Sequence, residues 1–270
     1  MTFGSYAEFT MVPSKHILPV ARPDPEVVAM LTSGLTASIA LEKAAQMDSG
    51  KTVLVTAAAG GTGQFAVQLA KLAGKGHCDL WRKDKAKLLK DLGVDRVIDY
   101  KLKISKLTNS LKVFIVYESV GGEMFDLCLN ALATYGCLVV IGMISQYQGE
   151  EGWKPRAYTG LCEKILAKSQ TVAGFFLVQY AHLWQEHLDK LVDLYSSGKL
   201  KVAVDPKPFL GVHSVADAVD YLHSGKSVGK NDHGRGFAVA INLQAEELLP
   251  AKTSKLLHQS KCGQYHKHRG

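Results

Sequence analysis

The sequence predicts an α/β protein built on a doubly wound parallel sheet. Between residues 51 and 177, short apolar segments rich in β-branched residues alternate with segments of helical periodicity. This alternation is typical of a parallel sheet with helices on both faces. In addition, 47% of the 270 residues are hydrophobic and 21% are charged. That composition favours a well-buried globular core over a disordered chain.

The predicted elements follow in order along the chain. Short extended segments lead to a turn at residues 21–25, and a long helix is expected from about Glu26 to Gln46 with a break near Ser33 and Gly34. Hydrophobic periodicity then separates the strands from the helices. Strands are expected at residues 52–56, 95–99, 113–118, 137–142, 171–177 and 200–204. Helices are expected at residues 62–73, 84–92, 122–133, 158–168, 181–196 and 214–223.

The segment 75–83 fits the predicted sheet poorly. A second parallel strand should lie here, and a buried parallel strand is nearly all apolar. Residues 75–80 read Lys-Gly-His-Cys-Asp-Leu and contain no β-branched residue. The sequence therefore predicts a weak strand at this place, or a segment altered relative to its relatives.

The positive net charge gives little support to a nucleic-acid partner. Of the formal charge of +7, a large part comes from the last twenty residues, which contain five basic residues and no acid. A polar, basic terminal segment of this kind is typical of a solvated, disordered tail. We therefore expect a disordered tail at 245–270 and no nucleic-acid binding by the globular part.

The remaining composition points to an intracellular protein without a metal centre. The five cysteines are scattered, with no CxxC pair and no Cys/His cluster at ligand spacing, so we expect neither zinc nor a disulfide framework. The chain opens without a secretory signal pattern, and its longest apolar run, residues 137–144, is too short to span a bilayer. We expect a cytoplasmic location and no membrane partner.

A glycine-rich turn follows the first strand of the alternating region. The G-x-G-x-x-G dinucleotide-binding pattern maps onto residues 58–63, A-A-G-G-T-G, with alanine at the first glycine. In such a turn Gly60 lets the backbone approach a diphosphate, and Gly63 lets the helix pack closely on the strand. The helix that begins near Thr62 directs unpaired N–H groups and its positive end at the phosphates. A dinucleotide site is therefore predicted.

The residues after this turn favour NADP over NAD. An NAD site usually has an acid about twenty residues past the turn, which binds the ribose hydroxyls. Here that place is Lys83, within W-R-K-D-K-A-K. A cluster of cations suits the 2′-phosphate of NADP through charge-assisted hydrogen bonds. The alternatives are a solvated, lysine-rich helix start, and Asp79 as the acid of an NAD site.

Five motifs in a fixed order connect the chain to a known family. The segments A-A-A-G-G-T-G-Q-F-A-V-Q-L-A-K-L-A-G, D-R-V-I-D-Y, V-Y-E-S-V-G-G, V-I-G-M-I-S-Q-Y and G-F-F-L resemble the zinc-independent quinone-oxidoreductase branch of the medium-chain dehydrogenases/reductases. The resemblance covers roughly residues 2–230 and implies a Rossmann domain beside the remnant of a truncated GroES-like catalytic domain. The implied regions are 1–23 (end of the GroES-like domain), 24–178 (NADP-binding Rossmann domain), 179–244 (completion of both domains) and 245–270 (basic tail).

The resemblance also assigns roles to particular residues. Lys85 and Tyr100 match positions that hold the adenosine 2′-phosphate, and residues 60–63 match the diphosphate turn (Gly60, Gly61, Thr62, Gly63). The wall around the nicotinamide and its ribose is matched by Ser119, Ile141, Tyr147, Phe175, Phe176 and Leu177. For Ile141 and the two phenylalanines, simple strand core is the competing interpretation. Zinc-bearing relatives place a ligand cysteine in a Cys-Gly pair about thirty residues before the glycine motif, and residues 31–36 of this chain contain neither cysteine nor histidine, so no catalytic zinc is expected.

The activity implied by the resemblance is an NADPH-dependent reduction of quinones or of the C=C bond of α,β-unsaturated ketones. Tyr147 is the predicted catalytic residue, as a hydrogen-bond donor beside the reacting groups. A homodimer is a further expectation from the family. The alternative is a truncated, catalytically inactive protein that binds NADPH or dimerises, because the substrate-binding domain is expected to be largely absent.

Overall fold

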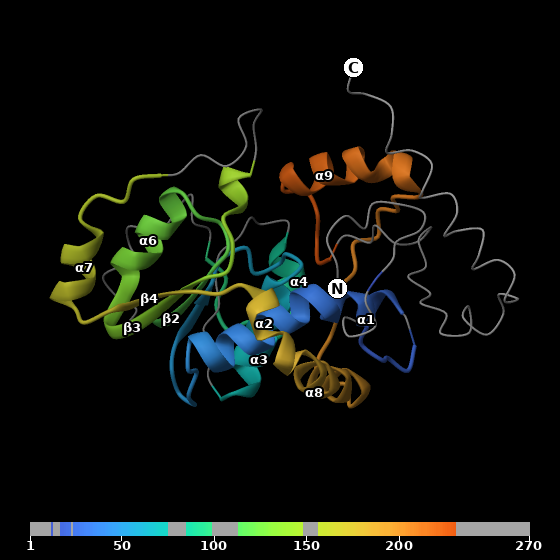
Figure 1. Ribbon diagram of the computed structural model, residues 1–270, viewed down its shortest axis with the longest axis horizontal. Coiled ribbons are helices and arrows are strands. Elements are labelled where there is room, and N and C mark those ends of the chain that lie inside the picture. The colour runs from blue at the N-terminus through green and yellow to red at the C-terminus, as the bar shows by residue number, and fades with distance from the viewer. Residues whose placement is uncertain are drawn as a thin grey trace, which may run out of the picture.

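The structure is a computed structural model that describes residues 12, 17–22, 24–74, 85–98, 113–147 and 156–230 (Figure 1). Its centre is a four-stranded sheet in the order β1-β2-β3-β4, and all neighbouring strands are parallel. The strands are β1 (Val53–Val55), β2 (Val113–Glu118), β3 (Leu132–Val140) and β4 (Thr171–Gly174).

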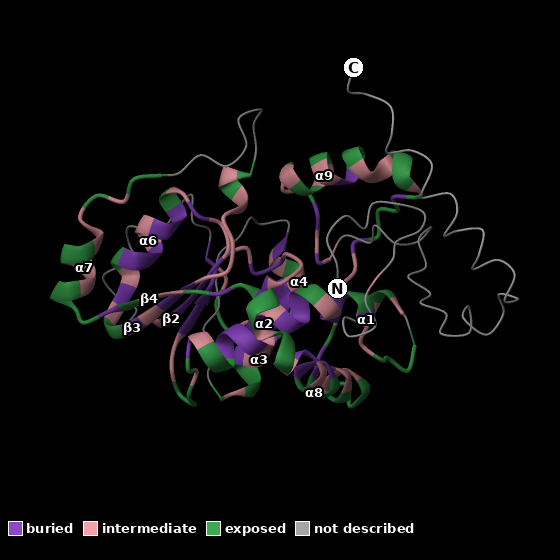
Figure 2. Ribbon diagram, in the orientation of Figure 1, coloured by how far each residue is buried: buried purple, intermediate pink, exposed green. Residues whose placement is uncertain are grey.

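Helices cover both faces of this sheet, which confirms the predicted doubly wound α/β fold. Successive strand residues alternate between the two faces: Val53 and Val55 of β1 join one core cluster, whereas Leu54 joins the other. On the first face lie α2 (Leu35–Ile39), α3 (Gly63–Leu72) and α8 (Trp184–Ser196), and on the second lies α6 (Glu123–Ala131) (Figure 1). β1 and β2 are buried along most of their length, as expected for strands covered on both sides, whereas the residues of β4 are half-buried or exposed (Figure 2).

Three further helices occur in the described part of the chain after residue 74. They are α4 (Ala86–Asp91), α7 (Leu161–Ala167) and α9 (Val215–His223), with 3-10 turns at Ile144–Gln146, Leu177–Leu183 and Val212–Ser214. The predicted helices from residue 62 onward are therefore confirmed, with ends that differ by a few residues. The domain limits proposed from the sequence stay predictions, and the predicted tail at 245–270 lies outside the described residues.

The first long helix is continuous where a break was predicted. It runs from Pro25 to Ala44 as α1 (Pro25–Ala29), a π-helical turn (Met30–Gly34), α2 and a second π-helical turn (Ala40–Ala44). Gly34 has right-handed helical dihedral angles, and a Cβ there would lie 3.0 Å from Cδ1 of Leu191 in α8. The glycine therefore permits close helix packing instead of ending the helix.

The same helix is long and apolar enough to cross a membrane by length and composition alone. Buried residues make up 56% of its most apolar window, and its buried side chains belong to the core cluster shared with α3 and α8. A core helix of a globular fold has the same composition.

Two predicted strands are wrong within the described residues. Residues 94–98 form no strand, although Ile98 buries its side chain in the second core cluster. At 200–204 only Val204 makes a bridge, to Lys230. A side chain supplies further partners for the backbone here: Gln64 of α3 donates to the carbonyl of Ala203 (2.9 Å), which also accepts from the N–H of Lys230, and it accepts from the N–H of Ala203 (2.6 Å).

Strand β3 begins earlier than predicted. It starts at Leu132, where the helix predicted for 122–133 has already ended, and the register to β2 shifts between Val113 and Ile115. Tyr135 has a left-handed φ of 62° inside this irregular stretch. The local pattern of apolar residues does not encode such a shift, because it depends on how β2 and β3 pair.

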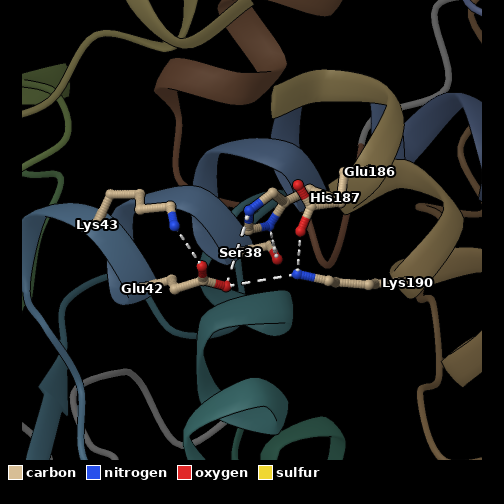
Figure 3. Close-up of polar contacts among 6 residues, drawn as sticks. All are labelled: Ser38, Glu42, Lys43, Glu186, His187 and Lys190. Atoms are coloured by element: carbon tan, nitrogen blue, oxygen red, sulfur yellow. Dashed lines mark hydrogen bonds and ion pairs between the residues drawn. The ribbon is translucent and has the colours of Figure 1, made fainter. Parts of the chain in front are cut away.

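A polar network joins the long helix to α8 (Figure 3). The hydroxyl of Ser38 lies 2.7 Å from Nδ1 of His187, and Oε2 of Glu42 lies 3.7 Å from Nε2 of the same ring. Lys190 extends the network to Glu186, at 2.7 Å. The His187 side chain is fully buried, and burial lowers the pKa of the imidazole although the carboxylate of Glu42 acts in the opposite direction. The ring is therefore held in its neutral form.

Candidate dinucleotide site at the carboxyl ends of the strands

The glycine-rich turn connects the end of β1 to the start of α3. The N–H of Thr56 continues the ladder to the carbonyl of Tyr117 (3.0 Å), and the N–H of Gly60 closes the turn on the carbonyl of Ala57 (2.8 Å). A Cβ on Gly63 would lie 2.4 Å from that Ala57 oxygen. Only glycine fits there while the helix begins so close to the strand.

A buried polar network joins the carboxyl ends of β1 and β2. The hydroxyl oxygen of Thr56 accepts a hydrogen bond from the N–H of Ser119 (2.8 Å). The fully buried carboxylate of Glu118 accepts from the N–H groups of Val120 (2.9 Å) and Gly121 (3.0 Å). Burial raises the pKa of Glu118, and these N–H donors partly offset that rise. The loop after β2 is thereby tied to the loop after β1.

The turn also has a second hydroxyl anchor. Thr62 lies 2.6 Å from the phenolic oxygen of Tyr117 and donates to the carbonyl of Ser33 at 3.0 Å. Tyr117 is fully buried, and burial raises the pKa of its phenol. The hydroxyl of Thr62 therefore fastens the start of α3 to β2 and to the long helix.

A cavity of about 800 Å³ opens where the turn and the β2 loop meet. Parallel α/β folds bind ligands in this crevice, outside the carboxyl ends of the strands. The lining contains three basic side chains, Lys85, Arg156 and His223, and one acidic side chain, Glu123. The excess of basic groups suits an anionic ligand. Small residues of the two loops also line the cavity, namely Ala57, Ala59, Gly60, Gly121 and Gly122.

Arg156 is held in the wall of the cavity by α6. Its guanidinium pairs with Asp126 at 2.8 Å and lies 5.8 Å from the centre of the Tyr158 ring. That ring in turn packs on Phe125, with 4.6 Å between ring centres. The sequence reasoning missed Arg156 and His223, because no motif marks them and only tertiary packing brings them to the cavity.

The segment before residue 230 docks onto the glycine-rich turn. The N–H of Gly229 donates to the carbonyl of Ala59 at 2.8 Å, and Gly60 and Gly229 form a parallel bridge. The buried amine of Lys85 donates to the carbonyl of Ser227. Residues about 170 positions apart in the chain thus form one wall of the cavity.

The structure brings only part of the predicted site together. Gly60 and Lys85 line the cavity, and Ser119 lies next to Val120 of the lining. Tyr147 directly follows three lining residues, is 49% exposed and accepts a hydrogen bond from the N–H of Met143 (3.1 Å). Tyr100 and the Asp79 alternative lie outside the described residues.

The four apolar residues assigned to the nicotinamide wall lie at the ends of β3 and β4. Ile141 packs against the first core cluster, and Phe175 and Leu177 are buried members of it. Phe175 also stacks on Tyr180, with 4.8 Å between ring centres, whereas Phe176 is 57% exposed. None of the four contributes to the described cavity, so their role at a cofactor stays a prediction.

Among the described residues, no group of three or more His, Cys, Asp or Glu side chains is placed to hold a metal ion.

Comparisons with known proteins show what this chain is similar to. A family model described as zinc-binding dehydrogenase matches residues 61–196. Prostaglandin reductase-3 of Mus musculus is 45% identical over 243 residues, which are 85% of this chain and 64% of the relative. A probable quinone oxidoreductase of Leishmania amazonensis is 38% identical, covering 85% of this chain and 70% of the relative.

Among solved structures, the quinone oxidoreductase of Escherichia coli complexed with NADPH is similar, with a TM-score of 0.68 and 29% sequence identity. The similarity covers 79% of this chain and 66% of that one. The chain thus spans slightly less than two thirds of the prostaglandin reductases that it matches.

Proposed function

Because this chain belongs to the medium-chain dehydrogenases/reductases, in the quinone-oxidoreductase-like branch, we propose that it binds NADPH and reduces quinones or the C=C bond of α,β-unsaturated ketones. The observation that carries the proposal is the cavity at the carboxyl ends of β1 and β2, which combines a glycine-rich turn with the buried cation of Lys85.

The residues present fit a dinucleotide. The missing side chain of Gly60 leaves the backbone open for close approach, and Gly63 lets α3 begin close to the strand. The positive end of α3, which is directed at this place, suits a diphosphate. The amine of Lys85, which donates to the carbonyl of Ser227, suits a 2′-phosphate, a stronger acceptor.

In the proposed reaction the bound nicotinamide supplies the hydride. The protein's part is to position the cofactor and the acceptor and to exclude water. Tyr147 is the proposed hydrogen-bond donor to the acceptor carbonyl. Its position next to Ile144, Ser145 and Gln146 of the cavity lining supports this role. No general acid is required if solvent protonates the reduced product.

A fluorescence titration with NADPH and NADH tests the proposal. We expect tighter binding of NADPH, and we expect Lys85→Met to weaken NADPH binding more than tenfold, since a charged contact contributes about 1.5–3 kcal/mol. Lys87→Met on the exposed face of α4 is the matched control. Equal affinities for the two cofactors in the wild type would contradict the proposed NADP preference.

A turnover assay with a quinone and an enone separates the two functional hypotheses. Turnover supports a reductase. Cofactor binding without turnover supports instead a catalytically inactive NADPH-binding or dimerising protein. The mass in solution, measured by light scattering, tests the homodimer, and fractionation of cells tests the proposed cytoplasmic location.

A further inference from the structure

Lys230 lies against the glycine-rich turn, on a segment that the sequence motifs do not mark. Its N–H donates to the carbonyl of Ala203 (2.9 Å), and its own carbonyl accepts from Asp205 (2.8 Å). The preceding residue, Gly229, forms the parallel bridge to Gly60. Gly229 has a φ of 76°, and a Cβ there would lie 2.3 Å from the oxygen of Ala203. The backbone at Lys230 is thus fixed on both sides.

The side chain of Lys230 passes directly over the turn. Its Cδ lies 3.3 Å from the position that a Cβ on Gly61 would occupy, and the hydroxyl oxygen of Ser33 lies at the same distance. The amine is two bonds beyond this Cδ, so it stays close to the start of α3. Lys230 does not belong to the lining of the cavity that contains Lys85. The two lysines therefore approach the turn at different places.

The charge of Lys230 has no counter-charge among the described residues. The ion pairs found there involve other cations, and the pKa of Lys230 is lowered because burial removes water from its charged form. Lys230 is half-buried, and holding a partly desolvated cation without a counter-charge costs free energy, which a bound anion would offset. By contrast, the amine of Lys85 already donates to the carbonyl of Ser227.

We propose that Lys230 binds the diphosphate of the dinucleotide from the side of Gly61. This inference rests on the proposed function. The start of α3 favours an anion at this place, and the diphosphate is the anionic group that NADPH and NADH share. Lys85 then discriminates between the two cofactors, whereas Lys230 contributes equally to the binding of both.

Titrations of the full chain with NADPH and with NADH test this division of roles. Lys230→Met keeps the stem that packs on Gly61 and removes the charge. We expect it to weaken the binding of both cofactors by about tenfold or more. Lys85→Met should weaken NADPH binding selectively. Lys226→Met, an exposed lysine on the same segment, should change neither, and Lys230→Arg should retain most of the affinity.

The possible results are distinguishable. Failure of the wild type to bind either cofactor would overturn the proposed function and this inference with it. Normal binding by the wild type, with affinities unchanged in Lys230→Met or reduced for NADPH alone, would overturn the role of Lys230 and leave the proposed function standing. Thermal melting verifies that each variant is folded. If Lys230→Met does not fold, Lys230→Gln replaces it with the same two outcomes.

Discussion

Gly63→Ala should destabilise the protein by pushing α3 away from β1. The added Cβ would lie 2.4 Å from the oxygen of Ala57, 2.7 Å from Cα of Ala58 and 2.9 Å from its carbonyl carbon. All three are backbone atoms, so no side chain can rotate away to relieve the contact. Ala57 already has a left-handed φ of 48°, and the turn has little freedom to adjust.

The size of this effect follows from the displacement required. To reach an ordinary contact of 3.4 Å, the carbonyl of Ala57 must move by about 1 Å relative to Gly63. Overpacking of this kind costs about 1–3 kcal/mol, which corresponds to a fall in Tm of about 2–12 °C for a chain of this size. The movement also displaces the N–H groups of α3, so we expect weaker NADPH binding.

Gly174→Ala is the matched control for this prediction. Gly174 ends β4, and a Cβ there would meet no atom within 4 Å. Because the new side chain mainly restricts the unfolded chain, this variant should keep its stability or gain about 0.4–1 kcal/mol. Thermal melting followed by circular dichroism compares the two variants. A Tm for Gly63→Ala equal to that of Gly174→Ala would refute the reasoning.

Two further predictions concern the contacts that hold the elements together. Burial lowers the pKa of His187 in the folded protein. As pH falls below about 6.5, the imidazole of His187 is therefore protonated in the unfolded chain before it is protonated in the folded one. The free energy of unfolding should then decrease, by at most about 1.4 kcal/mol per pH unit. His187→Phe should show a shallower pH dependence in urea unfolding, and identical slopes would contradict the prediction. Gln64→Leu leaves the N–H of Ala203 without its partner, whereas the carbonyl of Ala203 still accepts from the N–H of Lys230. The variant should therefore cost about 1–3 kcal/mol. The more exposed Gln185→Leu should change stability by less than about 0.5 kcal/mol, and equal losses would show that the contact to Ala203 is not important.

Much of the architecture follows from local pattern in the sequence. The apolar runs of β1 and β2 and the periodicity of α3, α6 and α8 specify their own element type, because their side chains must be buried on a sheet or a helix face. The glycine-rich turn was recognisable for a related reason. Gly63 sits where strand and helix approach too closely for a side chain, and that requirement is imposed by residues only a few positions away.

The parts that the sequence alone did not predict depend on contacts between distant residues. The segment at 200–204 resembles a strand, yet Gln64 binds its backbone in place of a neighbouring strand. Gly34 has the sequence pattern of a helix breaker, yet it lies within a continuous helix because α8 packs closely against it. Likewise, no local pattern marks Lys230 as a neighbour of Gly61. Only the tertiary structure determines these positions, because hydrogen-bond partners and unpaired charges depend on which segments meet in space.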